Sequence, residues 1–471
     1  MENLVIAKFG GSAIGVDGEF IPIIIKRMNE LKKDSKIIGV FSAPLILQHG
    51  KKRSLTDIIL DLGNKAETGE NVKIDLVKET YEKMLRFVDD KYKDACKDTI
   101  DSFLDKSLQA LRHASEKKEF ADVVRSKALA YSGEILMSHM MNYILKSNEI
   151  KSDAVGFDIW PIITDTNVES ANFLPSHSFQ KAEPMENLLE KNDVLLIGGF
   201  IGKTIDGLET TYERGGSDRT AADLGILLNK KYELKIDFEK DGSVASADPK
   251  IVSDGLDDIK KLSYNEARMA GMFGMKILDP IAIKEILENG VDLPIIITDM
   301  NNPKKITVIE RKPEKNDGNP LKIVTGKKNC AILRIESSAS HKLFNSLAKE
   351  KRYSEFVVLS PFIKDDTEFT RILFLDADYI RRNERYILSF DSLASITYNR
   401  CVITLIGDEM WRVQNIASRS SSKIGEAGLN ILNMDAQEET SRIIIVMEDV
   451  KDNLEKAIRA VHSERQKIKI V

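Results

Sequence analysis

Short apolar segments alternate with long stretches of helical periodicity over the N-terminal two thirds of the chain. The apolar segments include NLVIAKFGGSAIG, KIIGVFSAP, NDVLLIGGFIG and LPIIITDM, and a typical helical stretch is SKALAYSGEILMSHMMNYILKS. This alternation predicts an α/β fold whose largely parallel sheet is sandwiched by helices. Because ligands of such sheets bind beyond the carboxyl ends of the strands, the glycine-rich turns after the strands mark the expected site.

Composition narrows the class of protein. The 471 residues are 42% hydrophobic and 30% charged, which suits two or three folded domains and argues against a disordered chain. The net charge of -5 argues against a general nucleic-acid binder. The 3 cysteines are scattered, so we expect neither a disulfide scaffold nor a structural zinc site. With no signal-peptide pattern and no long apolar run, we expect a cytoplasmic protein that does not bind membranes.

The charged stretch ERKPEKNDGNP, residues 310–320, is interpreted as a domain boundary. Residues 1–312 are assigned to the α/β domain. Within it, residues of about 65–125 are rich in Lys, Glu and Asp at helical spacing, which predicts a helical insertion that serves as a solvated lid or flank.

The C-terminal part contains an internal repeat. NCAILRI begins at Asn329 and RCVITLI at Arg400, while TRILFL begins at Thr370 and SRIIIV at Ser441, so both pairs have the same offset of 71 (400 − 329 and 441 − 370). Each copy reads strand, helix, strand, strand, helix, which predicts two ferredoxin-like βαββαβ units at 321–392 and 393–471. The pattern leaves open which unit the final strand KIKIV completes.

The segment AKFGGSA is a candidate for phosphate binding. Lys8 precedes Gly10, Gly11 and Ser12, so an ammonium and bare backbone N–H groups would gather at the end of a strand. The Walker A pattern is absent, and an ordinary strand-to-helix turn has a similar composition.

The segment TYERGGSDRTAADLG is a second candidate anion site. Arg214 suits a bidentate grip on a carboxylate or phosphate. Gly215 and Gly216 would let a ligand come close to the start of the following helix, where Ser217 and Asp218 are natural caps. We expect Asp218 to organise Arg214 or a nearby metal ion, and the alternative is a helix cap with a surface ion pair.

Three further charged residues are weaker candidates. Glu134 lies on an otherwise apolar helix face, where a buried carboxylate needs either a ligand ammonium or a neighbouring Lys or Arg. Lys250 and Lys276 lie near the turn formers Asp248-Pro249 and Asp279-Pro280, where they are candidates for phosphate contact or ordinary solvated lysines.

Taken in order, these motifs resemble those of the aspartate kinases. The ordered set is Lys8-Phe9-Gly10-Gly11-Ser12, Ser42-Ala43, Gly133-Glu134, Gly199-Phe200-Ile201-Gly202, Arg214-Gly215-Gly216-Ser217-Asp218, Ala247-Asp248-Pro249-Lys250 and LSYNEA at 262–267. The repeat resembles the tandem ACT domains of that family, in segments such as IGEAGLNILNM. The resemblance covers nearly the whole chain.

The resemblance implies MgATP-dependent phosphorylation of the β-carboxylate of L-aspartate to 4-phospho-L-aspartate, on the way to lysine, threonine and methionine. It implies the catalytic residues Lys8, Arg214 and Asp218. It implies substrate contacts from Ser42, Thr56, Glu134 (with the α-ammonium), Arg214 (with a carboxylate), Gly215, Gly216 and Ser217. It implies nucleotide contacts from Lys8, Gly10, Gly11, Ser12, Asp248, Lys250 and Lys276.

The implied chemistry needs no general base, because the nucleophile is the β-carboxylate of the substrate, which is already ionised at neutral pH. The resemblance further implies that Mg²⁺ is held mainly by ATP rather than by a protein cluster. It implies a homodimer or larger homo-oligomer through the ACT units, with lysine or threonine as a possible effector.

The sequence also departs from the family pattern. Tyr212-Glu213 replaces Leu-Gly, Arg219 replaces Tyr, Phe or Thr, and FEKDGS replaces Thr-Asp-Val-Asp-Gly. These departures keep two alternatives open, namely another amino-acid kinase of the same fold and a non-catalytic homologue that senses an amino acid.

Overall fold

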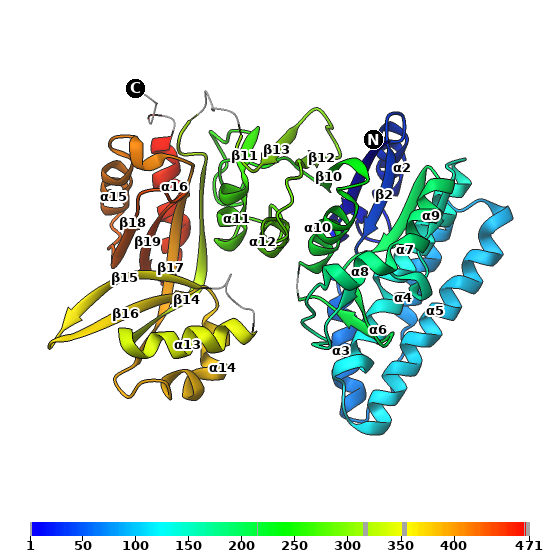
Figure 1. Ribbon diagram of the computed structural model, residues 1–471, viewed down its shortest axis with the longest axis horizontal. Helices are drawn as coiled ribbons and strands as arrows, with labels where there is room; N and C mark the ends of the chain where they lie inside the picture. The colour runs from blue at the N-terminus through cyan, green and yellow to red at the C-terminus, as the bar shows by residue number, and fades with distance from the viewer. Residues whose placement is uncertain (1, 214, 314–318, 351–355, 466, 468–471) are drawn as a thin grey trace. The chain divides into compact units, whose positions relative to one another are not determined.

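The computed structural model describes residues 2–213, 215–313, 319–350, 356–465 and 467, and the chain divides into two compact units (Figure 1). The first unit comprises Met1–Ser243 and Ala282–Glu310, and the second comprises Val244–Ile281 and Arg311–Val471. No helix within the described ranges is long and apolar enough to cross a membrane.

A largely parallel sheet forms the centre of the first unit. Its strands follow the order β12-β10-β1-β2-β7-β5, and each neighbouring pair in this series is parallel. An antiparallel strand, β13 (Ile306–Glu310), pairs with β12. The bounds are β1 (Glu2–Phe9), β2 (Lys36–Phe41), β5 (Ser152–Ala154), β7 (Val194–Gly198), β10 (Tyr232–Lys240) and β12 (Ile295–Asp299).

Helices cover both faces of this sheet. On one face, α2 (Ile21–Leu31) and α7 (Glu134–Ser147) share a buried cluster with Val5, Ala7 and Phe9 of β1. The helix α10 (Gly216–Leu228) packs on the other face, where a Cβ added at Gly225 would lie 3.1 Å from Ile236 Cδ1 of β10. Burial on both faces explains why the strands are continuously apolar, and the predicted α/β class is confirmed.

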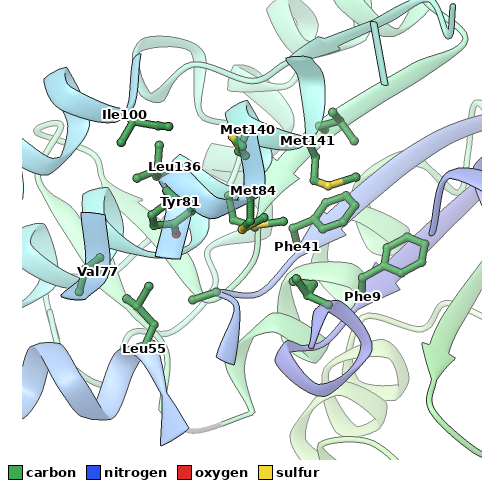
Figure 2. Close-up of a cluster of buried hydrophobic side chains, with 14 of the residues drawn as sticks. Phe9, Phe41, Leu55, Val77, Tyr81, Met84, Ile100, Leu136, Met140 and Met141 are labelled. Carbon is green, nitrogen blue, oxygen red and sulfur yellow. The ribbon is translucent and has the colours of Figure 1, made fainter. Parts of the chain in front are cut away.

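The predicted insertion is helical, as α3 (Leu55–Glu67), α4 (Asp75–Met84), α5 (Asp90–Lys117) and α6 (Asp122–Ser132) show. It is more than a solvated flank, because its side chains enter the main core. Figure 2 shows Tyr81 and Met84 of α4 beside Leu136 of α7 and Phe41 at the end of β2. The buried Tyr81 hydroxyl donates to the Ser132 carbonyl at 2.9 Å, which fixes α4 against the end of α6.

Smaller elements complete the first unit. They are α1 (Gly11–Ile14), the hairpin β3 (Leu45–Gln48) and β4 (Lys51–Ser54), the 3-10 turns η1 (Leu85–Phe87) and η2 (Phe157–Ile159), the small sheet β6 (Ile163–Thr164), β8 (Ile201–Thr204) and β9 (Glu209–Thr211), and the helices α8 (Pro175–Lys181), α9 (Glu183–Lys191) and α12 (Pro280–Glu288).

The second unit is built on an antiparallel sheet of order β15-β16-β14-β17-β19-β18. The bounds are β14 (Ile323–Glu336), α13 (Ser337–Glu350), β15 (Phe356–Lys364), β16 (Thr367–Phe374), α14 (Ala377–Leu388), β17 (Ser395–Ile406), η4 (Met410–Arg412), α15 (Ile416–Glu426), β18 (Asn433–Ala436), β19 (Arg442–Glu448) and α16 (Asn453–Arg465). This order of strands and helices fits the two predicted ferredoxin-like copies.

The two copies share their central strands. β14 and β17 pair antiparallel from Ile323 opposite Ile406 to Arg334 opposite Ser395, with Cys330 opposite Arg400 near the middle. The pairs Val324–Leu405 and Arg334–Ser395 are related by the repeat offset (324 + 71 = 395 and 334 + 71 = 405), and equivalent positions meet only near Arg400, as a local twofold axis between the copies requires. The first half of each strand serves as the fourth strand of the other copy. Residues 468–471 of KIKIV lie outside the described residues.

The segment Val244–Ile281 belongs to the second unit, although the sequence places it inside the predicted domain of residues 1–312. The physical reason is burial, because Ala247 and Val252 lie in the same apolar cluster as Leu405 of β17 and Ile445 of β19. The segment also carries β11 (Lys261–Ser263) and α11 (Tyr264–Met272).

A buried ion pair joins this segment to the start of β14. Glu266 closes a capping box with Ser263 at the start of α11, and its side chain is 0% exposed. Its carboxylate accepts hydrogen bonds from Lys322 Nζ and from the Asp408 amide, both at 2.6 Å. Burial raises the pKa of Glu266, so the Lys322 ammonium is needed to keep the carboxylate ionised.

Lys322→Met is expected to lower the free energy of unfolding of the second unit by about 3–5 kcal/mol, because the buried Glu266 carboxylate loses its cation. Hydrogen exchange of peptides from β14 and α11, read by mass spectrometry, measures the change. Adding Glu266→Gln should restore most of the protection, since a neutral amide needs no cation. Equal protection in the single and double variants would contradict this account.

Candidate functional site

The predicted site residues of the first unit gather at the carboxyl ends of β1, β2 and β7. Lys8, the last residue but one of β1, forms a 2.6 Å ion pair with Asp218 in the first turn of α10. The two side chains are only 10% and 9% exposed. A partly desolvated pair of this kind fixes the lysine ammonium in place and is screened little by salt.

The chain leaves β1 through glycines that keep the space beside the Lys8 ammonium open. A Cβ added at Gly10 would lie 3.3 Å from Lys8 Nζ, and one at Gly11 would lie 2.9 Å from the Ala43 carbonyl oxygen. Ser12 follows in α1 and is exposed. An ammonium flanked by bare backbone fits a phosphate group, as the sequence predicts.

The start of α10 depends on three glycines. Gly215 caps the helix at φ +92°, a left-handed conformation that favours glycine. A Cβ at Gly216 would lie 2.4 Å from Tyr212 Cβ, and one at Gly199 would lie 2.6 Å from Ser217 Cβ. Gly199, which follows β7, was not predicted as a site residue, although its family motif was recognised. Arg214 lies outside the described residues.

Two hydroxyl groups connect β2 to α10. Ser42, directly after β2, donates from its Oγ to Ser217 Oγ at 3.0 Å. The predicted substrate residue Thr56 lies half-buried in the first turn of α3, next to Leu55. A Cβ added at Gly133 would lie 3.9 Å from Leu55 Cδ2 and 3.4 Å from Ala43 Cβ, which places this turn beside the residues around Glu134.

Glu134 is a buried carboxylate at the same edge of the sheet. It begins α7, is 5% exposed, and accepts a 3.4 Å hydrogen bond from the Ala43 amide. Burial raises its pKa to about 7, against the opposing effects of backbone amides and the Lys8 charge. Among the described residues, no Lys or Arg forms a salt bridge with it. A ligand ammonium would supply the missing cation.

Three predicted nucleotide-binding residues belong to the second unit. Asp248 accepts a hydrogen bond from the Lys250 amide at 2.9 Å, which closes the Asp-Pro-Lys turn. The side chains of Lys250 and Lys276 are exposed on this unit. Their roles remain those that the resemblance implies.

The two residues that flank the Arg-Gly-Gly-Ser-Asp motif and depart from the family pattern, Glu213 and Arg219, are each bound by neighbouring side chains. Arg219 is buried, contacts Glu285 of α12 at 2.6 Å, donates to the Ala171 carbonyl and stacks over the Tyr212 ring at 4.0 Å. The Glu213 carboxylate accepts a 2.8 Å hydrogen bond from Ser170. Arg219 therefore completes a structural ion pair.

The sequence of this chain is similar to those of known kinases. The family model described as "Amino acid kinase family" matches residues 3–299. The chain belongs to the amino acid kinase family. Curated relatives within it include an aspartokinase of Rickettsia felis, 25% identical over 74% of this chain and 84% of that protein. Another is the chloroplastic aspartokinase 3 of Arabidopsis thaliana, 24% identical over 97% of this chain and 81% of that protein.

Solved structures of this kinase family share the fold along the chain. Escherichia coli aspartokinase III in complex with aspartate and ADP matches with a TM-score of 0.77 at 16% identity, covering 98% of this chain and 99% of that one. Clostridium acetobutylicum aspartate kinase matches with a TM-score of 0.65 at 20% identity, covering 99% and 100%. These findings confirm the predicted resemblance and fold. The chain also spans about half the length (50%) of a bifunctional aspartokinase/homoserine dehydrogenase of Arabidopsis thaliana.

Arg219→Tyr, which restores a residue typical of the family, is expected to destabilise the first unit by about 3 kcal/mol because Glu285 loses its buried cation. Urea unfolding followed by the fluorescence of buried Trp160, in a Trp411→Phe background, measures the change. Adding Glu285→Leu should recover most of the loss. Unfolding of Arg219→Tyr at the same urea concentration as its parent would show that the ion pair is dispensable.

Proposed function

We propose that this protein is an aspartate kinase, which transfers the γ-phosphoryl group of MgATP to the β-carboxylate of L-aspartate and forms 4-phospho-L-aspartate and ADP. One observation carries the proposal. The fixed ammonium of Lys8 and the cation-deficient carboxylate of Glu134 lie at the same edge of the sheet, so a phosphate and an amino acid are both matched in charge. The aspartokinases among the relatives support the same conclusion.

In this proposal, the first unit acts by positioning and by neutralising charge. Lys8 binds the phosphoryl oxygens, with backbone groups of Gly10 and Gly11 and the hydroxyl of Ser12 beside it. Asp218 holds the Lys8 ammonium through the 2.6 Å ion pair. Because the β-carboxylate of aspartate is the nucleophile and is ionised at neutral pH, no side chain has to remove a proton.

The amino-acid pocket is proposed to lie between β2, α7 and the start of α10. Glu134 binds the α-ammonium, and Arg214 grips a carboxylate. The remaining proposed contacts are hydroxyl and backbone groups from Ser42, Thr56, Gly215, Gly216 and Ser217. The hydrogen bond between Ser42 and Ser217 supports this grouping, because it holds two of the proposed contacts together.

Asp248, Lys250 and Lys276 are proposed to contact the nucleotide, as the resemblance implies. Among the described residues, no three His, Cys, Asp or Glu side chains form a group that could hold a metal ion. We propose that Mg²⁺ enters with the ATP phosphates, whose negative charge it neutralises when bound.

The alternative of a non-catalytic amino-acid sensor rested on Glu213, Arg219 and the altered FEKDGS segment. Arg219 is buried against Glu285, and Glu213 is bound by Ser170. Because Glu285 balances the charge of Arg219, this residue adds no free cation to the proposed site, which favours the kinase.

The second unit is proposed to be a tandem ACT regulatory unit that binds an amino-acid effector such as lysine or threonine. It is also proposed to form a homodimer or larger homo-oligomer. The strand β15 supports this, because it lies at the edge of the sheet among the described strands and its Val358 and Ile363 are 43% and 74% exposed. The proposed location is the cytoplasm.

The deciding experiment measures ADP release from MgATP with L-aspartate, with L-glutamate and N-acetylglutamate as controls. Turnover should require aspartate, and Arg214→Ala should raise the aspartate KM by about tenfold or more because a charge-assisted contact is lost. Repeating the assay with lysine and with threonine tests feedback. Folded protein that releases ADP with none of the substrates would overturn the proposed function.

The pH dependence of aspartate binding tests the role of Glu134. Its pKa of about 7 in the free protein should fall when the α-ammonium binds, so binding below pH 7 releases a proton. Affinity should therefore rise about tenfold between pH 6 and pH 8. Calorimetry in buffers of different ionisation enthalpy measures both the affinity and the proton release.

Glu134→Gln should bind aspartate more weakly at pH 8 and show a flat profile. The matched control is Glu149→Gln, an exposed carboxylate just beyond the other end of α7, which should keep the parental profile. A pH dependence that survives in Glu134→Gln would assign the titration to another group.

A further inference from the structure

The last residue of β10, Lys240, carries a second ammonium to the side of the sheet where Lys8 lies. β1 and β10 are parallel neighbours in which Lys8 is opposite Phe238. Side chains at matching register in parallel strands project from the same face, and alternate residues of a strand share a face. Phe238 and Lys240 therefore share the face of Lys8. This is the face of α10, because Ile236 of the same set meets Gly225.

The two buried carboxylates of β10, Asp237 and Glu239, project to the opposite face and are already engaged. Glu239 is fully buried and accepts a 2.7 Å hydrogen bond from Arg27 of α2. Asp237 accepts a 2.7 Å hydrogen bond from Thr298 of β12 and lies 4.0 Å from Arg27. Neither carboxylate is placed to neutralise Lys240.

Lys240 is thus a partly buried cation whose charge is not balanced by a carboxylate of its own strand. Within the described part of the chain its ammonium forms no salt bridge. Its pKa is lowered, first by burial and also by the Lys8 charge, while Asp218 opposes the shift. Asp218 is already paired with Lys8 at 2.6 Å, and Asp241, the other carboxylate that opposes the shift, is exposed to solvent, so the site favours an anion beside the two ammonium groups.

We propose that Lys240 is a second phosphate-binding lysine, which together with Lys8 holds the terminal phosphoryl group of ATP during its transfer. The inference rests on the proposed kinase function and assigns a further residue to that site. It also gives a role to the FEKDGS segment, in which Lys240 lies and in which this chain departs from the family pattern. Two lysines would neutralise charge on the phosphoryl oxygens from β1 and from β10.

The test compares a nucleoside triphosphate with a diphosphate, since only the former has the terminal group. In Lys240→Met, calorimetry should show the Kd for the magnesium complex of the β,γ-imido analogue of ATP rise by about tenfold, while the Kd for ADP changes by less than about twofold. Lys240→Arg should keep most of the preference for the triphosphate over the diphosphate, because arginine keeps the positive charge. In turnover, Lys240→Met should lower kcat far more than it changes the aspartate KM.

A matched control is Lys235→Met on the same strand, whose side chain points to the opposite face and which should bind both nucleotides as the parent does. Lys240→Met should stay folded, as circular dichroism will verify, because it removes a cation that has no salt bridge.

Three outcomes separate the claims. Loss of the triphosphate preference in both Lys8→Met and Lys240→Met supports the proposal. Loss in Lys8→Met alone overturns the role of Lys240 and leaves the kinase function standing. Failure of the parent protein to bind either nucleotide overturns both.

Discussion

The ion pair between Lys8 and Asp218 is the contact on which the site depends. It joins the end of the central strand β1 to the first turn of α10, and it forms only where those two elements come very close. That approach explains the glycines, because a side chain at Gly199 would collide with Ser217 and one at Gly216 with Tyr212. The left-handed cap at Gly215 then turns the chain into a helix whose residues are all buried. Backbone geometry, rather than side-chain chemistry alone, is what places the lysine.

The charges around this pair are balanced for ligands rather than for the free protein. Glu134 is buried without a cation in a salt bridge, which raises its pKa, and Lys240 is partly buried without a salt bridge, which lowers its pKa. Each pKa shift shows that burial destabilises the charged form of the side chain in the free protein. An amino acid would bring an ammonium to the first and a phosphate would bring an anion to the second. A site of this kind trades stability for binding, because its charges are satisfied only when both ligands are present.

Much of the fold followed from the sequence, because its signals were local. Continuous apolar runs identified the strands buried on both faces, and the offset of 71 residues identified the two copies of the repeat. The candidate site was predicted through the order of Lys8, Ser42, Glu134 and Asp218, which the structure brings together at one edge of the first unit. Contacts between residues far apart in the sequence could not be predicted from it. The sequence gives no sign that Arg219 pairs with Glu285, that α4 and α5 enter the core, or that Val244–Ile281 joins the second unit. From the sequence, Lys240 was noted only as part of the altered segment FEKDGS. Its proposed role in phosphate binding depends on the register of β10 against β1, which the sequence does not show.

The packing of Val244–Ile281 connects the proposed effector-binding sheet to the proposed nucleotide contacts within the second unit. Asp248 and Lys250, the proposed nucleotide contacts, follow directly on Ala247, which is buried in the same cluster as strands β17 and β19. The Glu266–Lys322 ion pair ties the same segment to β14, the strand that both copies of the repeat share. An effector that changed the packing of this sheet would therefore act on the anchor of those contacts without a long relay of residues. Coupling in such a system needs only that the two arrangements of one packed core differ in how they hold the segment.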